Sequence, residues 1–311
     1  HGTNVFASRF SGNWVSKWKS HEYESLAVDY SGPFYASFSG TSTRVLMRNI
    51  AIAVLDSFSE KPFSGNPAAV CLLESPLQTT EMQAIAMEMN LSETAFVEKT
   101  EEEGSFSLRW FTPMLEIDLC GHATLASAFW MYSQGWAKEG DEIKFQTLSG
   151  VLSVTKQGDL VCMNFPLIPT QVATHPAYPK EIFGSKVIQA AQLRKNWIFE
   201  LADEEAVRSF QPDFAQIAAN SEEGFVITAP GTGDYDLVSR FFGPNVGIPE
   251  DPVTGFAHCA LVDYWNQKTG KTKFKAYQAS ARGGTLYLEI QGDRVLIQGK
   301  AVEVLVGTMS C

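Results

Sequence analysis

The stretch GHATLASAFWMYSQG, residues 121–135, decides the fold class, because the helix that it predicts is apolar on almost every side. Gly135 closes this stretch, as glycine commonly closes a helix. A second stretch, GFAHCALVDYWNQKTG at residues 255–270, has the same character and the same ending. A helix without a polar face must be enclosed by other elements, so the sequence predicts two buried helices, each central to its own lobe.

Short motifs repeat around these two helices in the same order. SETAFV at 92–97 matches SEEGFV at 221–226, and RWFTP at 109–113 matches RFFGP at 240–244. The spacing rises only from 129 residues (positions 92 and 221) to 134 residues (positions 121 and 255). One such match alone would be noise, but the ordered set predicts an internal duplication.

Strand patterns surround each predicted helix. FSLRWF at 106–111 and DLVSRFF at 236–242 alternate in part and are rich in aromatic residues. After each helix, GVLSVTKQGDLVCMNF at 150–165 and GGTLYLEIQGDRVLIQG at 283–299 predict a hairpin with a Gly-Asp turn. We therefore expect an α+β fold of two lobes related by a pseudo-twofold axis. Antiparallel strands wrap one central helix in each lobe, and a cleft lies between the lobes.

Changes in the pattern set the expected limits of the lobes. Residues 1–46 are rich in Ser and lack helical or alternating periodicity, so we expect an extension outside the folded core. The first lobe is expected at 47–165 and the second at 166–311. Four prolines between Pro166 and Pro179 predict the linker.

Composition excludes several classes of partner. The 311-residue chain is 45% hydrophobic and has a net charge of -11, which is typical of an acidic globular protein. This charge disfavours nucleic acid and anionic membrane surfaces, so we expect neither as a partner. The five cysteines show no disulfide or ligand spacing, which favours free thiols and a cytoplasmic location. The five histidines form no recognisable metal set, so we expect no metal.

Each predicted helix begins at a glycine-led loop, DLCGH at 118–122 and EDPVTGF at 250–256. The backbone N–H groups at a helix start can hold a carboxylate or phosphate. Gly121, Thr254 and Gly255 are therefore candidates for binding a small anion. The alternative is that the glycines serve tight turns and close helix packing.

Four polar residues near these loops are candidates for the chemistry. Glu93, at the entrance of a predicted strand, can transfer a proton if it is buried, or is solvated like its repeat mate Glu222. His122 titrates near neutral pH, or bonds nearby backbone at the helix start. Asp251 is either a capping acid or a second acid/base. Asn66 is either a turn residue or a polar contact for substrate.

Five motifs occur in this order along the chain: SFSEKPFSGNPAAV (57–70), LSETAFV (91–97), RWFTP (109–113), LCGHATLASA (119–128) and GIPEDPVTG (247–255). Together they resemble the PhzF-like (phenazine biosynthesis) family, which shares the diaminopimelate epimerase fold. The resemblance extends from Met47 to the C-terminus.

The resemblance implies both a fold and an activity. Each lobe would be a barrel-like, mostly antiparallel sheet around its central helix. The prototype of the family isomerises a dihydro-hydroxyanthranilate by moving a proton between ring carbons, without metal or organic cofactor. Its proton-transferring glutamate corresponds to Glu93, and its cleft histidine and aspartate correspond to His122 and Asp251. The amides of the two glycine-led loops would then hold the substrate carboxylate.

Two departures from the family pattern affect the expected site. The usual TGSA is here TGFA at 254–257, so Phe256 replaces a hydroxyl and is expected to line and narrow the substrate site. Fold relatives that racemise amino acids use two facing thiols, whereas this chain has Cys120 in the first loop and no thiol in the second. We therefore expect Cys120 to be a packed thiol.

These observations predict a cofactor-independent isomerase of a small carboxylate-bearing metabolite, with proton transfer by Glu93. Isologous pairing is common for such chains, so a homodimer is expected. Two alternatives stay open. One is a non-catalytic binding or interaction protein that retains the fold, which Phe256 motivates. The other is an epimerase that depends on Cys120.

Overall fold

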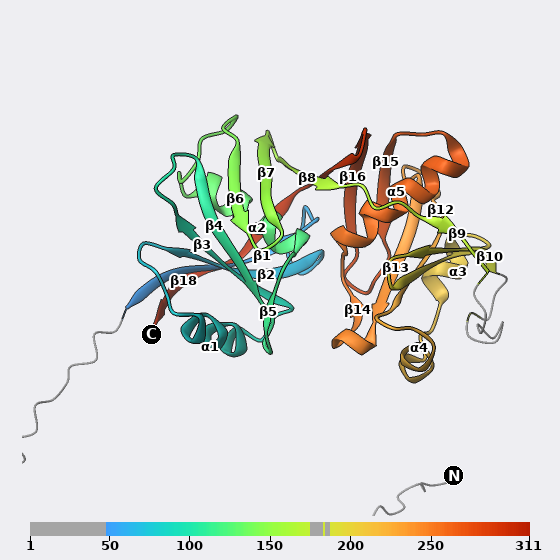
Figure 1. Ribbon diagram of the computed structural model, residues 1–311, viewed down its shortest axis with the longest axis horizontal. Helices are drawn as coiled ribbons and strands as arrows, with labels where there is room; N and C mark the ends of the chain where they lie inside the picture. The colour runs from blue at the N-terminus through green and yellow to red at the C-terminus, as the bar shows by residue number, and fades with distance from the viewer. Residues whose placement is uncertain (1–47, 175–182, 184–186) are drawn as a thin grey trace, which may run out of the picture. The chain divides into compact units, whose positions relative to one another are not determined.

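The computed structural model describes residues 48–174, 183 and 187–311 (Figure 1). The chain from Leu46 to Cys311 forms one compact unit. The extension expected at 1–46 lies outside the described residues, as does part of the linker expected between Pro166 and Pro179. Within the described part, none of the helices combines the length and apolar character that a membrane span requires.

The first half of this unit contains, in chain order, β1 (Asn49–Ser57), β2 (Asn66–Leu73), α1 (Thr79–Met89), β3 (Glu93–Lys99), β4 (Ser105–Phe111), β5 (Glu116–Ile117), α2 (Gly121–Ser133), β6 (Ile143–Thr147), β7 (Gly150–Gln157) and β8 (Leu160–Pro166). The second half contains β9 (Gln171–Val172), β10 (Val187–Leu193), β11 (Asn196–Leu201), α3 (Glu204–Ser209), α4 (Phe214–Asn220), β12 (Phe225–Pro230), β13 (Leu237–Gly243), the 3-10 turn η2 (Pro244–Val246), β14 (Ile248–Asp251), α5 (Gly255–Thr269), β15 (Lys273–Gln278), β16 (Gly284–Gln291), β17 (Arg294–Gly299) and β18 (Ala301–Ser310).

Both halves pair their strands in the same way. In the first half β1 and β2 are antiparallel, β2 and β3 parallel, and β3 and β4 antiparallel. β4 is also parallel to β6, which leads into the antiparallel strands β7 and β8. The second half repeats this sequence of pairings with β10, β11, β12, β13, β15, β16 and β17. The mostly antiparallel α+β architecture is confirmed, and the duplication that would explain it stays a prediction.

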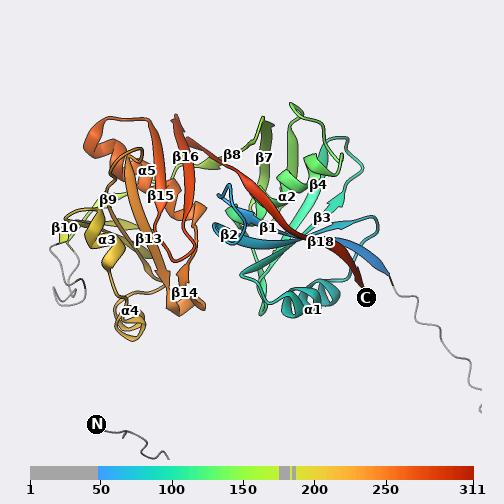
Figure 2. The same cartoon turned by 180° about the vertical axis from the view of Figure 1, so that it is seen from behind.

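One strand pair, β8 with β17, joins the two halves into one sheet. β8 runs antiparallel to β17, with Met163 opposite Ile297. β18 lies beside β1 (Figure 2) and runs antiparallel to it, with Ile50 opposite Met309. The last strand therefore pairs within the first half, although the expected second lobe, 166–311, includes it. The lobe limits themselves stay a prediction.

The helices α2 and α5 are central to the two halves, as the two apolar stretches predict (Figure 1). α2 buries Leu125, Trp130 and Met131, and α5 buries Leu261 and Trp265. Each large apolar side chain contributes about 1.5–3 kcal/mol when fully buried. This packing fixes both helices, and with them the position of the first turn of each.

Candidate active site

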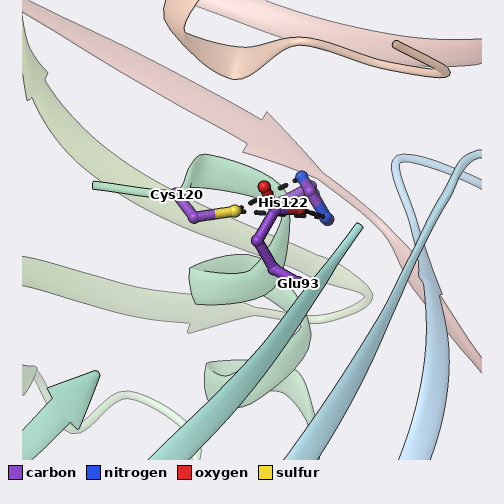
Figure 3. A group of neighbouring side chains, drawn as sticks. All are labelled: Glu93, Cys120 and His122. Carbon is purple, nitrogen blue, oxygen red and sulfur yellow. Dashed lines mark hydrogen bonds and ion pairs between the residues drawn. The ribbon is translucent and has the colours of Figure 1, made fainter. Parts of the chain in front are cut away.

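Glu93 is the first residue of β3, and its side chain is buried. β3 runs parallel to β2, so the two strands begin at the same edge of the sheet, with Glu93 opposite Ala68. The Glu93 carboxylate points toward α2, where its Oε2 lies 3.1 Å from His122 Nε2 (Figure 3). Within the described residues, this pairing with His122 is the only polar contact of Oε2, so the buried carboxylate depends on a single neighbour.

His122 lies in the first turn of α2 and is also buried. Its Nδ1 lies 3.1 Å from Asn66 Nδ2, and its backbone carbonyl accepts a hydrogen bond of 2.7 Å from Ser57 Oγ. Burial alone lowers the pKa of His122, but its interactions with Cys120 and Glu93 outweigh burial and raise the pKa well above 6.5.

Asn66 connects the two halves of the molecule. It is fully buried at the start of β2, where its Nδ2 donates to Asp251 Oδ1 at 2.8 Å and to the Val253 carbonyl at 3.0 Å. The same atom is the one that faces His122. Asn66 thus bonds directly to the second half, whereas its 3.1 Å approach to protonated His122 brings two donors together and is not a hydrogen bond.

Asp251 ends β14 and is buried. Its Oδ2 accepts a hydrogen bond of 2.5 Å from Thr254 Oγ1. Burial raises the pKa of Asp251 from 3.8 to about 6, although the charge of His122 and the hydrogen bonds from Thr254 and Asn66 act in the opposite direction. The Gln278 side chain fixes this loop, since its Nε2 donates to the Asp251 carbonyl at 2.7 Å and its Oε1 accepts from the Thr254 N–H at 2.8 Å.

The starts of α2 and α5 meet at this cluster. A methyl group added to Gly121 would lie 3.5 Å from the Cα of Gly255, and the reverse distance is 3.6 Å. Neither helix has a side-chain cap at its first turn, whereas α3 and α4 are capped by Asp203 and Asp213. The two uncapped starts therefore bring unpaired N–H groups and two positive dipole ends to one place, which is a favourable setting for an anion.

Cys120 belongs to the same cluster, although the sequence favoured a merely packed thiol. Its Sγ lies 3.4 Å from His122 Nδ1, and Figure 3 shows it directed at the imidazole. Burial and the charge of Glu93 raise the pKa of the thiol, while His122 lowers it. One donor atom from each of Glu93, Cys120 and His122 lies within 4.8 Å of the others, a set that could approach a metal ion such as zinc. The expectation of no metal stays a prediction.

Phe256 follows Gly255 in the first turn of α5 but takes no part in the polar contacts described above. Its ring is half-buried against the apolar core, and the Arg194 guanidinium lies over it at 5.6 Å from the ring centroid. The repeat mate of Glu93, Glu222, is exposed. The site is therefore asymmetric, because the first half supplies the Glu and the His and the second half supplies the Asp.

Sequence reasoning missed one residue of this site, Gln278, and left the role of another, Cys120, between two alternatives. Cys120 carried a signal, its position directly before Gly121, but that signal does not separate a packed thiol from a functional one. Gln278 carried none, because β15 reaches the Asp251 loop only through tertiary packing. The other candidates, Glu93, His122 and Asn66, lie together as expected, and their roles stay predictions.

The two uncapped helix starts can hold a small anion, and the buried carboxylate beside the imidazole can exchange a proton with it. Comparison with known proteins identifies a family for the chain. Residues 55–307 match the family model described as phenazine biosynthesis-like protein. A Pseudomonas aeruginosa protein named as an uncharacterized isomerase is 43% identical over 261 residues, which cover 84% of this chain and 98% of that protein.

Solved structures agree with the sequence match. A PhzF-family phenazine biosynthesis protein from Enterococcus faecalis has 41% identity and a TM-score of 0.79, and the match covers 84% of this chain and 99% of that one. A hydroxyproline epimerase from Agrobacterium vitis shares the fold at 9% identity, with a TM-score of 0.56 and coverage of 85% and 93%. The resemblance and the fold class expected from the motifs are thus confirmed, and this chain belongs to the phenazine biosynthesis-like (PhzC-PhzF) protein family.

Proposed function

We propose that the protein is a cofactor-independent isomerase of a small carboxylate-bearing metabolite, with Glu93 as the group that carries the proton. The observation that supports this most is the buried Oε2 of Glu93, which pairs with His122 at 3.1 Å and with no other described residue. The names of close relatives as isomerases support the reaction class.

In the proposed reaction, Glu93 takes a proton from a substrate carbon next to an activating group. The electron pair of the broken C–H bond moves into that group as enolate-like charge. Protonated Glu93 then returns the proton to a second carbon, so that substrate and product differ only in the position of one hydrogen and of the double bond. No external oxidant or reductant is needed.

The two helix starts would hold the substrate carboxylate and stabilise the developing charge. The Thr254 N–H already donates to Gln278, so it is not free to bind the substrate in this arrangement. The free donors are then expected at Gly121 and Gly255. Because these two glycines are in contact, the carboxylate would lie beside them and not directly between their Cα atoms.

His122 and Asp251 would act as positioning groups. His122 holds Glu93 through the Nε2 contact, and Asn66 hydrogen-bonds to Asp251 and to the Val253 carbonyl. Loss of the contact between His122 and Glu93 should lower turnover without removing Glu93 itself.

The test is proton exchange in D₂O with a panel of small unsaturated and aromatic carboxylic acids, followed by mass spectrometry. We expect deuterium incorporation by wild type and a loss of at least about a hundredfold in Glu93→Gln. Glu98→Gln is the matched control, since Glu98 lies on the same strand but outside the cluster. Equal incorporation by wild type and Glu93→Gln would remove Glu93 from the mechanism.

A Cys-dependent epimerase is the second candidate, and the 3.4 Å contact between Cys120 and His122 is the observation that favours it. Cys120→Ser separates the two in the same assay. Retained exchange supports Glu93, whereas loss of exchange in Cys120→Ser with retention in Glu93→Gln supports the thiol. Binding of an acid without exchange in any of the proteins would favour the non-catalytic alternative.

Incubation with a chelator should leave the exchange rate unchanged.

A further inference from the structure

A cavity of about 460 Å³ lies beside the proposed active site, since Phe58 in its lining follows Ser57, which donates to the His122 carbonyl. One wall is the loop between β1 and β2, and the other is formed by β15, β16 and the turn between them. Glu93, His122 and Asp251 do not line it. Nothing in the proposed reaction uses this cavity.

The lining of the cavity is basic, although the chain as a whole has a net charge of -11. Two of its cations are already paired: an Arg282 nitrogen lies 2.6 Å from Asp56, and Lys300 Nζ lies 3.0 Å from Glu60. The other two cations that line it are Lys61 and Lys275. Neither has a carboxylate partner within the part of the chain that the structure describes. An excess of unpaired positive charge in a concave site favours an anionic ligand.

Three tyrosines give the cavity an aromatic side. Lys275 Nζ lies 5.1 Å from the ring centroid of Tyr235 and 5.8 Å from that of Tyr287. Tyr235 also packs against Tyr277, with ring centroids 5.1 Å apart, and its hydroxyl lies 3.2 Å from Thr285 Oγ1. The rings hold the Lys275 ammonium in place by cation–π attraction without neutralising its charge, so the ammonium stays able to bind an anion.

We propose that this cavity is a second ligand site that binds a small aromatic anion. The ring of the ligand packs against the tyrosines, and its carboxylate or phosphate binds to Lys275 and Lys61. A charged group and a ring recognised together give the site its selectivity, because a ligand with only one of them loses the contacts of the other.

Calorimetric titration of the full chain with phenyl phosphate and with benzoate tests the proposal. Phenyl phosphate should bind wild type and Glu93→Gln equally, and Lys275→Met should weaken it at least about tenfold through loss of a charge-assisted contact. Lys144→Met is the matched control, because Lys144 is an exposed strand lysine outside the cavity. Lys61→Met, on the loop, repeats the test without touching a strand. Inorganic phosphate and phenol should each bind at least about tenfold more weakly than phenyl phosphate.

Several outcomes would overturn the proposal. Wild-type affinity in both Lys275→Met and Lys61→Met would place the ligand elsewhere, as would a loss confined to Glu93→Gln. Inorganic phosphate binding as tightly as phenyl phosphate would show that the tyrosines do not select an aromatic ligand. The absence of binding for both aromatic anions at millimolar concentration would exclude the site altogether.

Discussion

Replacement of Asp251 by Asn should stabilise the protein at neutral pH, because the buried carboxylate is costly in its charged form. Burial raises its pKa from 3.8 to about 6. The folded state therefore binds this proton more tightly than the unfolded state does. The contribution of Asp251 to the free energy of unfolding of wild type therefore falls as the pH rises from about 4 to about 6.

The size of the effect follows from the shift. At about 1.4 kcal/mol per pKa unit, the penalty above pH 6 is about 3 kcal/mol. Asn carries no charge, so its burial does not have this free-energy cost. Its amide oxygen can still accept from Asn66, and its amide nitrogen can donate to Thr254 Oγ1, so both hydrogen bonds of the carboxylate have replacements.

A second buried group masks, in wild type, the pH dependence of stability that Asp251 contributes. Burial lowers the pKa of His258 from 6.5 to about 4. The unfolded state then binds the proton more tightly, so stability rises over nearly the same pH range, again by about 3 kcal/mol. The two pH dependences oppose each other. The contribution of Asp251 is therefore isolated by the difference in the free energy of unfolding between Asp251→Asn and wild type.

The assay is urea unfolding of both proteins at low concentration, at about pH 4 and about pH 7.5, because the sequence pI is about 5.0 and solubility is lowest between these values. The free energy of unfolding of Asp251→Asn, relative to wild type, should increase by about 2 kcal/mol from the acid to the neutral condition, because a smaller part of the penalty is already present at pH 4. A difference that does not change with pH would refute the reasoning. It would mean that Asp251 is charged in the folded state at no cost, and the proposed electrostatics of the site would be wrong.

Two further changes follow from the same structure. His258→Gln should remove the acid sensitivity of this group, so its stability relative to wild type should rise by about 3 kcal/mol on going from pH 7.5 to pH 4 in the same urea assay; an unchanged difference would mean that His258 is charged in the folded protein. Gly65→Ala should cost at least about 2 kcal/mol, because Gly65 has φ +72° and an added Cβ would lie 2.1 Å from the Ser57 carbonyl oxygen. Gly233→Ala, with φ +61° and open space around it, is the control and should cost about 1 kcal/mol; equal losses in the two would contradict the steric argument.

Local patterns determined much of the architecture. The two apolar stretches became α2 and α5, and the Gly-Asp turns became the hairpins β7–β8 and β16–β17. These predictions succeeded because helix periodicity, turn residues and strand alternation are decided by residues close together in the chain. The ordered motifs also identified the family, since several short matches in one order are far more specific than any one of them.

Tertiary structure decided the partners of each residue. The pairing of β18 with β1 and of β8 with β17 joins strands that are distant in sequence, and no local pattern encodes it. The same is true of the Asn66 side chain, which reaches Asp251 across the two halves, and of Gln278, which fixes the Asp251 loop. Sequence named the acid, Glu93, but its burial and the approach of His122 to 3.1 Å exist only once α2 has packed inside its sheet. A pKa depends on burial and on neighbouring charges in three dimensions, so the sequence supplied the chemical groups and the packed fold set their properties.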